Sequence, residues 1–218
     1  MEKIHDTVPH IELRGFRARF YDQLILIGTL GLYNPLIKKI ILDMEIHPAD
    51  KILDLGAGTG KNEVLMNQYL SDKGYITACE ISAEMKKKFQ KLCDGFPNIT
   101  LMPLRIERPL PFRDEFDKVF LSFVIHGFTQ DKRELILENA FNALKPGGRL
   151  FIFDWNEFRL EDSGPLMRLF MNYIECEEAK DFIRRNFCRV LSEKGFRRVN
   201  QRLYAWGKFR LLSADKQR

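Results

Sequence analysis

Short apolar runs and amphipathic stretches alternate along the chain between residues 51 and 154. Runs of strand length lie at 51–55, 75–80, 98–104, 116–123 and 149–154. Between them, apolar residues recur every three or four positions at 59–70, 82–92 and 131–144, which predicts helices. Alternating β and α units of this length predict an α/β fold with a right-handed, doubly wound parallel sheet. Its ligand would bind beyond the carboxyl ends of the strands.

The two ends of the chain add to this alternation. Residues 1–47 begin irregularly and then predict helices at 23–33 and 36–44, separated at Asn34-Pro35. After the fifth strand we expect an inserted segment at 155–173, a helix at 177–194 and a closing hairpin of strands 196–203 and 206–213. The hairpin brings the sheet to seven strands, the last of them antiparallel. The 218 residues are therefore expected to form one domain, 48–218, preceded by a helical segment, 1–47.

The first strand runs directly into a loop with glycine at every second position, Gly56-Ala-Gly-Thr-Gly60. Glycine lets the backbone turn sharply and approach a ligand closely. The helix expected next begins at this loop, which is an arrangement that suits a nucleotide. The spacing differs from the Gly-x-Gly-x-x-Gly of dinucleotide-binding enzymes, and Asp54 just before the loop disfavours a phosphate and favours an ammonium group. Glu80 ends the second apolar run, where an acid can accept both hydroxyls of a ribose.

With Asp54 before it and Glu80 after it, the glycine loop resembles that of the class I S-adenosylmethionine (SAM) methyltransferases. Further motifs are similar to those of the ubiquinone and menaquinone biosynthesis branch (methyltransferase type 11). They are Leu-Pro-Phe at 110–112, Phe-Asp at 116–117, Leu-Lys-Pro-Gly-Gly at 144–148 and Gly-Phe-x-x-Val at 195–199. The resemblance covers about residues 45–216.

The resemblance implies a Rossmann-like fold and SAM as the cofactor, with the methionine part on the glycine loop and the ribose on Glu80. It also implies that the helical segment 1–47 lies over the cofactor as a lid. The implied cofactor-binding residues are Asp54, Gly56, Ala57, Gly58, Gly60, Glu80, Ile81, Arg105, Ile106 and Ser122. No metal ligand is implied. The acceptor stays open, because similar domains methylate quinones, sterols, lipids and small metabolites.

One position departs from the family pattern. Before Leu-Pro-Phe the family usually has an Asp that accepts a hydrogen bond from the adenine amino group, whereas this chain has Arg105, which cannot accept one. Adenine would then be held by backbone groups around Arg105 and Ile106, by water or by Glu107. The alternative is a SAM-binding module without turnover.

Methyl transfer from the sulfonium of SAM mainly needs desolvation and alignment of the acceptor, so catalytic side chains can be few. His126 follows the fourth strand, where acceptor and cofactor should meet, and histidine suits a general base. Its alternative role is to hydrogen-bond the loop. Tyr21 is the second catalytic candidate, because Tyr21-Asp22 matches a Tyr-Asp pair in the lid of many SAM methyltransferases; a packing tyrosine is the alternative. Asp154 and Glu157 are further candidates for the base.

The inserted segment favours a small, hydrophobic acceptor of quinone or lipid type. Its apolar residues would roof the acceptor pocket, although core packing explains each of them as well: Phe158, Leu166, Leu169, Phe170 and Met171. The apolar stretch 24–32 would line the same pocket, contact a membrane surface as a peripheral protein does, or pack on the sheet.

The net charge of +5 is unevenly distributed. From Arg184 to the end, eleven Lys or Arg stand against two acids, a net +9, which leaves −4 for the first 183 residues. A basic end suits an anionic membrane surface or an RNA substrate; a solvated basic face is the alternative. Nucleic acid is not favoured, because the segment from Ser122 to Ile125 has neither the Asn/Asp-Pro-Pro-Tyr/Phe motif nor the Cys nucleophile of base methyltransferases.

The sequence lacks a signal pattern, and its longest apolar run is too short to span a bilayer, so we expect a cytoplasmic protein. Its four cysteines have no CxxC spacing: Cys79, Cys93, Cys176 and Cys188. We interpret them as reduced packing residues, neither disulfides nor zinc ligands.

Overall fold

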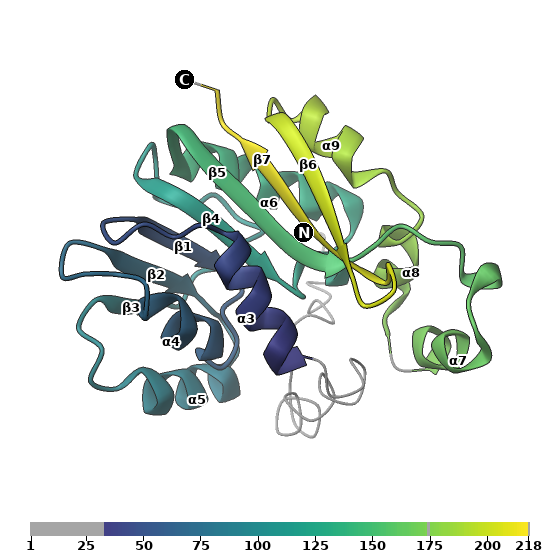
Figure 1. The fold of residues 1–218 in the computed structure, drawn as a ribbon, viewed down its shortest axis with the longest axis horizontal. Coiled ribbons are helices and arrows are strands. Elements are labelled where there is room, and N and C mark those ends of the chain that lie inside the picture. The colour runs from purple at the N-terminus through teal and green to yellow at the C-terminus, as the bar shows by residue number, and fades with distance from the viewer. Residues whose placement is uncertain (1–32, 174, 218) are drawn as a thin grey trace, which may run out of the picture.

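The computed structural model describes residues 33–173 and 175–217, and these form a seven-stranded sheet in the order β3-β2-β1-β4-β5-β7-β6 (Figure 1). The strands are β1 (Lys51–Leu55), β2 (Tyr75–Cys79), β3 (Ile99–Met102), β4 (Phe116–Ser122), β5 (Leu144–Trp155), β6 (Arg197–Tyr204) and β7 (Phe209–Asp215). Neighbours pair in parallel, except that β7 runs antiparallel to both β5 and β6. The predicted fold class, a doubly wound and mostly parallel sheet with the last strand antiparallel, is confirmed.

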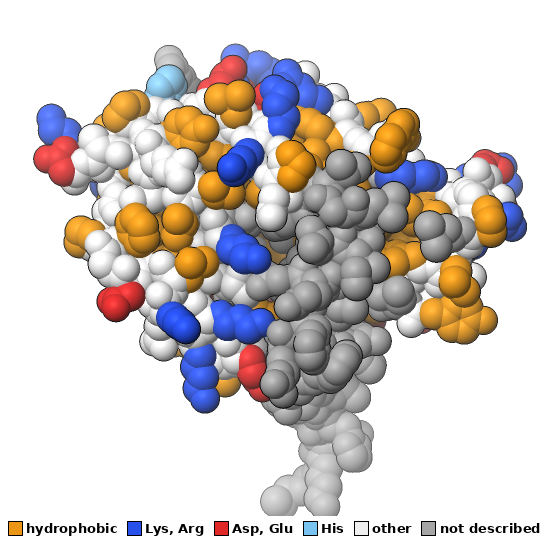
Figure 2. All heavy atoms as spheres, turned by 60° about the horizontal axis from the view of Figure 1, so that its bottom comes forward, with side chains coloured by type: hydrophobic (Ala, Val, Ile, Leu, Met, Phe, Trp, Pro, Cys, Tyr) orange, Lys and Arg blue, Asp and Glu red, His pale blue; other side chains and the backbone are white. Residues whose placement is uncertain are grey.

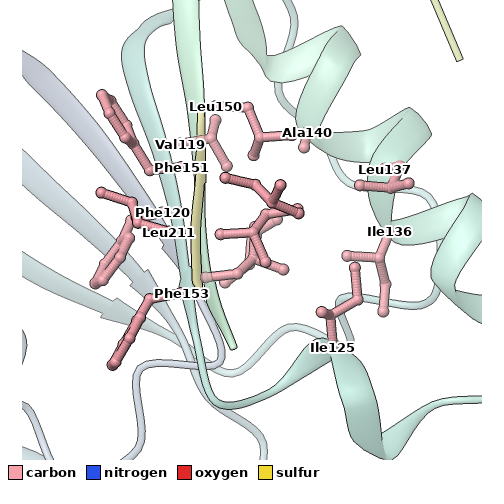
Figure 3. Packing of buried hydrophobic residues seen from close by; sticks show 14 of the residues in the cluster. Val119, Phe120, Ile125, Ile136, Leu137, Ala140, Leu150, Phe151, Phe153 and Leu211 are labelled. Atoms are coloured by element: carbon pink, nitrogen blue, oxygen red, sulfur yellow. The ribbon is translucent and has the colours of Figure 1, made fainter. Parts of the chain in front are cut away.

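Helices cover both faces of the sheet. They are α3 (Tyr33–Asp43), α4 (Lys61–Asn67), α5 (Ala83–Cys93), α6 (Gln130–Ala143), α7 (Pro165–Tyr173), α8 (Glu177–Phe182) and α9 (Phe187–Glu193), with single turns η1 (Ile125–Gly127) and η2 (Leu160–Asp162). On one face, Val119 and Leu150 point toward α6, whereas Phe151 and Phe153 point to the opposite face (Figure 3). Because side chains alternate along a strand, the continuous apolar runs of β4 and β5 fill both layers.

The helix after the glycine loop differs from the prediction. It spans Lys61–Asn67 rather than 59–70, and its buried face is Asn62, Glu63 and Met66. Tyr69, which the apolar pattern placed on that face, is exposed. The pattern was misleading here because Glu63 of α4 interacts with the buried carboxylate of Asp54, so polar side chains occupy the inner positions.

Two other helix boundaries were wrong. The helix expected at 177–194 is divided into α8 and α9, because the side chain of Asn186 accepts a hydrogen bond from the backbone N–H of Arg189 and starts a new helix. The break expected at Asn34-Pro35 is absent, since α3 already includes Tyr33. Proline is tolerated in a first helical turn, where its missing N–H has no intrahelical partner to lose.

The described part of the segment 1–47 packs into the main core. Ile37, Ile40, Ile41 and Met44 are all buried against the sheet. The remainder of the segment, with Tyr21, lies outside the described residues, so its function as a lid stays a prediction.

The helix α7 lies at the right edge of the molecule, away from the sheet (Figure 1). Leu169 and Tyr173 on this helix are 57% and 77% exposed. Hydrophobic side chains gather on this projection in Figure 2. Among the described residues, none of the helices has the length and hydropathy of a membrane span.

Candidate active site

The glycine loop turns back on the carboxyl end of β2. Gly56, Gly58 and Gly60 have φ of 91°, 60° and 88°, in the left-handed region that glycine adopts at little cost. The N–H groups of Gly56 and Ala57 both donate to the carbonyl of Cys79, at 2.9 and 3.0 Å. Two N–H groups of the loop are therefore hydrogen-bonded within the protein, and these bonds fix the loop to β2.

Two of the loop glycines are also required by close neighbours. A Cβ on Gly56 would lie 2.5 Å from Cγ2 of Val124, and one on Gly60 would lie 2.7 Å from Sγ of Cys93. Both distances are far below van der Waals contact. The loop is thus packed between α5 and Val124, which belongs to the segment that follows β4.

Glu80 connects the glycine loop to the end of β2. Its Oε2 accepts a hydrogen bond from the N–H of Gly58 at 3.0 Å, and its Oε1 accepts one from the N–H of Ser82 at 2.7 Å. Burial raises the pKa of Glu80, although these hydrogen bonds oppose the shift. The structure therefore brings Glu80 and the loop together, as the sequence spacing predicts. Ile81, the next residue, is half-buried.

The loop after β3 is held by a residue that the sequence analysis missed. Nδ2 of Asn139 on α6 donates to the carbonyls of Ile106 and Arg108 at 2.8 and 2.7 Å, and its Oδ1 accepts from the N–H of Leu110. Ile106 is buried, while Arg105 forms an ion pair with Glu107 at 3.0 Å. Asn139 is buried on the apolar face of α6, and that position was the signal that could have identified it.

Buried polar atoms without partners mark the centre of the site. Neither carboxylate oxygen of Asp54 nor the hydroxyl of Ser122 has a hydrogen-bond partner within the described residues. Asp54 is fully buried, and Ser122 ends β4 beside it in the sheet order. Such atoms normally have partners, so a polar, cationic ligand fits this position.

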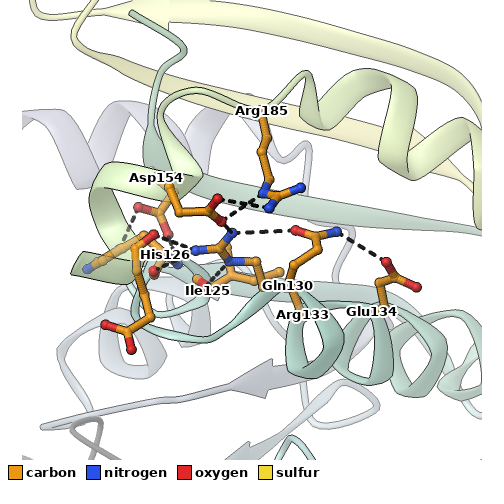
Figure 4. Close-up of polar contacts among 9 residues, drawn as sticks. Ile125, His126, Gln130, Arg133, Glu134, Asp154 and Arg185 are labelled. Carbon is orange, nitrogen blue, oxygen red and sulfur yellow. Dashed lines mark hydrogen bonds and ion pairs between the residues drawn. The ribbon is translucent and has the colours of Figure 1, made fainter. Parts of the chain in front are cut away.

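His126 lies between two carboxylates. Its Nδ1 is 2.7 Å from Oδ1 of Asp154 (Figure 4). Its Nε2 is 3.6 Å from Oε2 of Glu175. Burial alone would lower the pKa of His126, but the two carboxylates raise it to about 9. The imidazole is therefore protonated at neutral pH, and it becomes a base only when it loses that proton.

Arg133 fixes the turn that carries His126, and the sequence analysis missed this residue too. It is fully buried and donates to the carbonyls of Ile125 and His126, to that of Glu178, and to the carboxylate of Asp181 (Figure 4). These contacts join α6, η1 and α8 at one guanidinium.

Aromatic side chains surround the other side of His126. Phe123 has a φ of 51°, which is unusual for a residue with a bulky side chain. Its ring lies 6.4 Å from that of His126 and 6.1 Å from that of Trp155. Phe158 and Phe170 of the inserted segment pack on Trp155 in turn. Of the five predicted roof residues, Phe158 and Phe170 thus reach the aromatic cluster next to His126, whereas Leu169 is exposed.

Comparisons with known proteins agree with this geometry. A family model described as a methyltransferase domain matches residues 52–148. The chain is 32% identical over 177 residues to the ubiquinone/menaquinone biosynthesis C-methyltransferase UbiE of Vibrio cholerae, covering 79% of this chain and 64% of that protein. It is 29% identical over 166 residues to the protein of the same name from Methylococcus capsulatus, covering 71% of this chain and 66% of that one. Over the matched residues the chain is similar to the class I SAM-dependent methyltransferases.

The methyltransferase resembles the UbiE branch, and its cofactor is SAM. The crystal structure of a SAM-dependent methyltransferase from Aquifex aeolicus has the same fold, with a TM-score of 0.61, 22% identity, and coverage of 83% of this chain and 89% of that chain. The match to the two UbiE proteins spans less than two thirds of their length, at 64% and 66%.

Proposed function

We propose that this methyltransferase transfers the methyl group of SAM to a small hydrophobic acceptor of quinone or lipid type. The observation that carries the proposal is that two candidate sites meet. The glycine loop with Glu80 contacts the segment of His126 where Val124 packs against Gly56. The UbiE relatives, named as quinone C-methyltransferases, support the class of acceptor.

The residues that would hold the cofactor stand at the carboxyl ends of β1, β2 and β4. Asp54, whose buried carboxylate has no partner in the described residues, would bind the ammonium group, and Gly56, Ala57, Gly58 and Gly60 would bind the methionine part. Glu80, beside Ile81, would bind the ribose hydroxyls. The backbone of Arg105 and Ile106, in a loop that Asn139 holds in place, would bind the adenine. The hydroxyl of Ser122 would be a further polar contact.

The acceptor lies among the aromatic side chains beside His126. When bound, SAM supplies an electrophilic methyl group, and His126 takes a proton from the acceptor. A base with a pKa near 9 suits a phenolic hydroxyl, whose own pKa is about 10. Tyr21 lies outside the described residues and stays a candidate catalytic residue.

The charges of the C-terminal part speak against an RNA substrate. Seven of its eleven basic side chains form ion pairs, and five of these reach acids earlier in the chain: Arg185 to Asp181, Lys194 to Glu134, Arg202 to Asp43, Arg210 to Glu157 and Lys216 to Asp114. The other two are Arg189 with Glu193 and Arg198 with Asp215. Side chains neutralised by acids of the same chain are less available to a phosphate backbone.

Replacing Glu80 by alanine is expected to weaken SAM binding roughly 10- to 150-fold, the equivalent of about 1.5–3 kcal/mol for hydrogen bonds to a charged group. Titration calorimetry with SAM, and separately with its demethylated product, measures this. The exposed Glu138 of α6 gives a matched control, and Glu138→Ala should bind like the unmodified protein. Unchanged affinity in Glu80→Ala would refute the ribose assignment. Binding of SAM without methylation of any quinol or lipid acceptor would favour a module without turnover.

A further inference from the structure

A second carboxylate lies beside that of Asp54. Glu63, in the first turn of α4, is fully buried, and neither of its carboxylate oxygens has a hydrogen-bond partner within the described residues. An acid is rarely buried without a partner, because an isolated charge loses its hydration. Glu63 is outside the glycine motif, and the resemblance gives it no function.

The carboxyl groups of Asp54 and Glu63 are close enough for a hydrogen bond once one of them carries a proton. Apart from the backbone N–H of Glu63 itself, no N–H or O–H of the described residues reaches the four oxygens, so a shared proton is the partner that the site offers. Burial raises the pKa of Asp54 to about 7 and that of Glu63 well above its usual value. Two carboxylates buried side by side cannot both ionise without a large cost, so the pair holds a proton until a cation replaces it.

The groups around the pair add negative rather than positive charge. Glu80, at the end of β2, raises the pKa of both acids. The thiols of Cys79 and Cys93 face them from β2 and α5 and are neutral, since burial raises both of their pKa values to about 12. Lys86 of α5 is near Glu80, and its positive charge lowers the pKa of that residue. From α3 the buried side chains are apolar, namely Ile37, Ile40 and Ile41.

We propose that Glu63 is a cofactor-binding residue, and that Asp54 and Glu63 together receive the ammonium group of SAM and release their shared proton as it binds. The inference deepens the proposed function and rests on it. The ammonium replaces the proton as the cation between the two carboxylates, and the proton passes to the buffer. The O–H bond that held the shared proton breaks, a buffer base takes the proton, and no other covalent bond changes.

The exchange makes cofactor affinity depend on pH. Where one proton leaves for each cofactor bound, the dissociation constant falls up to about tenfold per pH unit. We expect SAM to bind more tightly as pH rises from 6 to 8. The demethylated product carries the same ammonium group, so its affinity should change in the same way.

Titration calorimetry in phosphate and in Tris, whose ionisation enthalpies differ, gives the number of protons released. At pH 7 we expect about one proton for both SAM and the demethylated product. In Glu63→Gln the amide donates a hydrogen bond to Asp54, which stays ionised, so release should fall toward zero. Glu138→Gln is the matched control and should release as many protons as the unmodified protein.

The outcomes separate this inference from the proposed function. Binding of both ligands without proton release, or release that persists in Glu63→Gln, overturns the inference and leaves SAM binding intact. Proton release with SAM but not with its demethylated product would assign the release to the sulfonium. This result would also overturn the inference. Failure of both ligands to bind overturns the proposed cofactor site itself.

The unliganded protein provides a second readout. A folded carboxyl pKa above its unfolded value means that stability falls as pH rises, here from about 4 to 7. Urea unfolding should show a flatter fall in Glu63→Gln, and Asp54→Asn serves if that variant does not fold. An unaltered pH dependence in the variant contradicts the shared proton.

Discussion

Replacing His126 by asparagine is expected to lower kcat for methyl transfer by about 10²- to 10⁴-fold, the usual contribution of a positioned general base. Asparagine keeps a polar side chain near Asp154 but cannot take a proton from the acceptor. The affinity for SAM should stay the same, because the imidazole contacts Asp154 and Glu175 and no residue of the glycine loop. Single-turnover rates with the acceptor found in the screen measure the effect.

The pH profile distinguishes a base from a residue that only holds the loop. The Asp154 and Glu175 carboxylates raise the pKa of His126 to about 9, so the rate of the unmodified enzyme should rise with pH until about 9. Asp154→Asn removes the nearer carboxylate, which is 2.7 Å away, and should move this rise to lower pH. The exposed His47 provides a control, since His47→Asn should leave the profile unchanged. A rise near pH 9 that persists in His126→Asn would assign the base elsewhere.

The carboxylates of Asp154 and Glu175 should also make the stability of the fold depend on pH. A histidine whose folded pKa is raised stabilises the fold fully below its unfolded value of about 6.5, and this stabilisation is lost as pH rises through about 9. The free energy of unfolding should therefore decrease across this window in the unmodified protein and stay flatter in His126→Asn.

The sequence predicts the sheet well because its signals there are local. Continuous apolar runs, a glycine at every second loop position and the Leu-Lys-Pro-Gly-Gly motif at 144–148 each depend on a few neighbouring residues. The order β3-β2-β1-β4-β5-β7-β6 then follows from the handedness of the crossovers and from the resemblance to methyltransferases.

What the sequence could not reveal depends on partners distant along the chain. The pKa of His126 depends on Glu175, 49 positions later, and the orientation of Glu63 depends on the buried Asp54 under α4. A prediction from apolar periodicity assigns polar side chains such as these to the exposed face of a helix. Arg133 nevertheless precedes Ile136, Leu137 and Ala140 by three, four and seven positions, which places it on the apolar face of α6. The sequence could therefore have predicted that Arg133 is buried, but not which groups it binds.

Arg133 is expected to be the most costly polar side chain to remove. Arg133→Leu should lower the free energy of unfolding by about 3–5 kcal/mol, because three backbone carbonyls on η1 and α8 lose their donor in a buried position. The ring of Phe182 would also lose the guanidinium 5.1 Å above it. Urea unfolding at neutral pH measures the change.

Arg185 provides a matched control because it shares the carboxylate of Asp181 but is 41% exposed, whereas Arg133 is fully buried. Arg185→Leu should cost at most about 1 kcal/mol, as exposed ion pairs do. Arg133→Lys keeps the charge on one nitrogen and cannot reach η1 and α8 together, so it should recover only part of the loss. Equal costs for Arg133→Leu and Arg185→Leu would mean that the ion pair to Asp181, and not the link between η1 and α8, stabilises this part of the fold. His126 would then be held in place by the carboxylates of Asp154 and Glu175 rather than by Arg133.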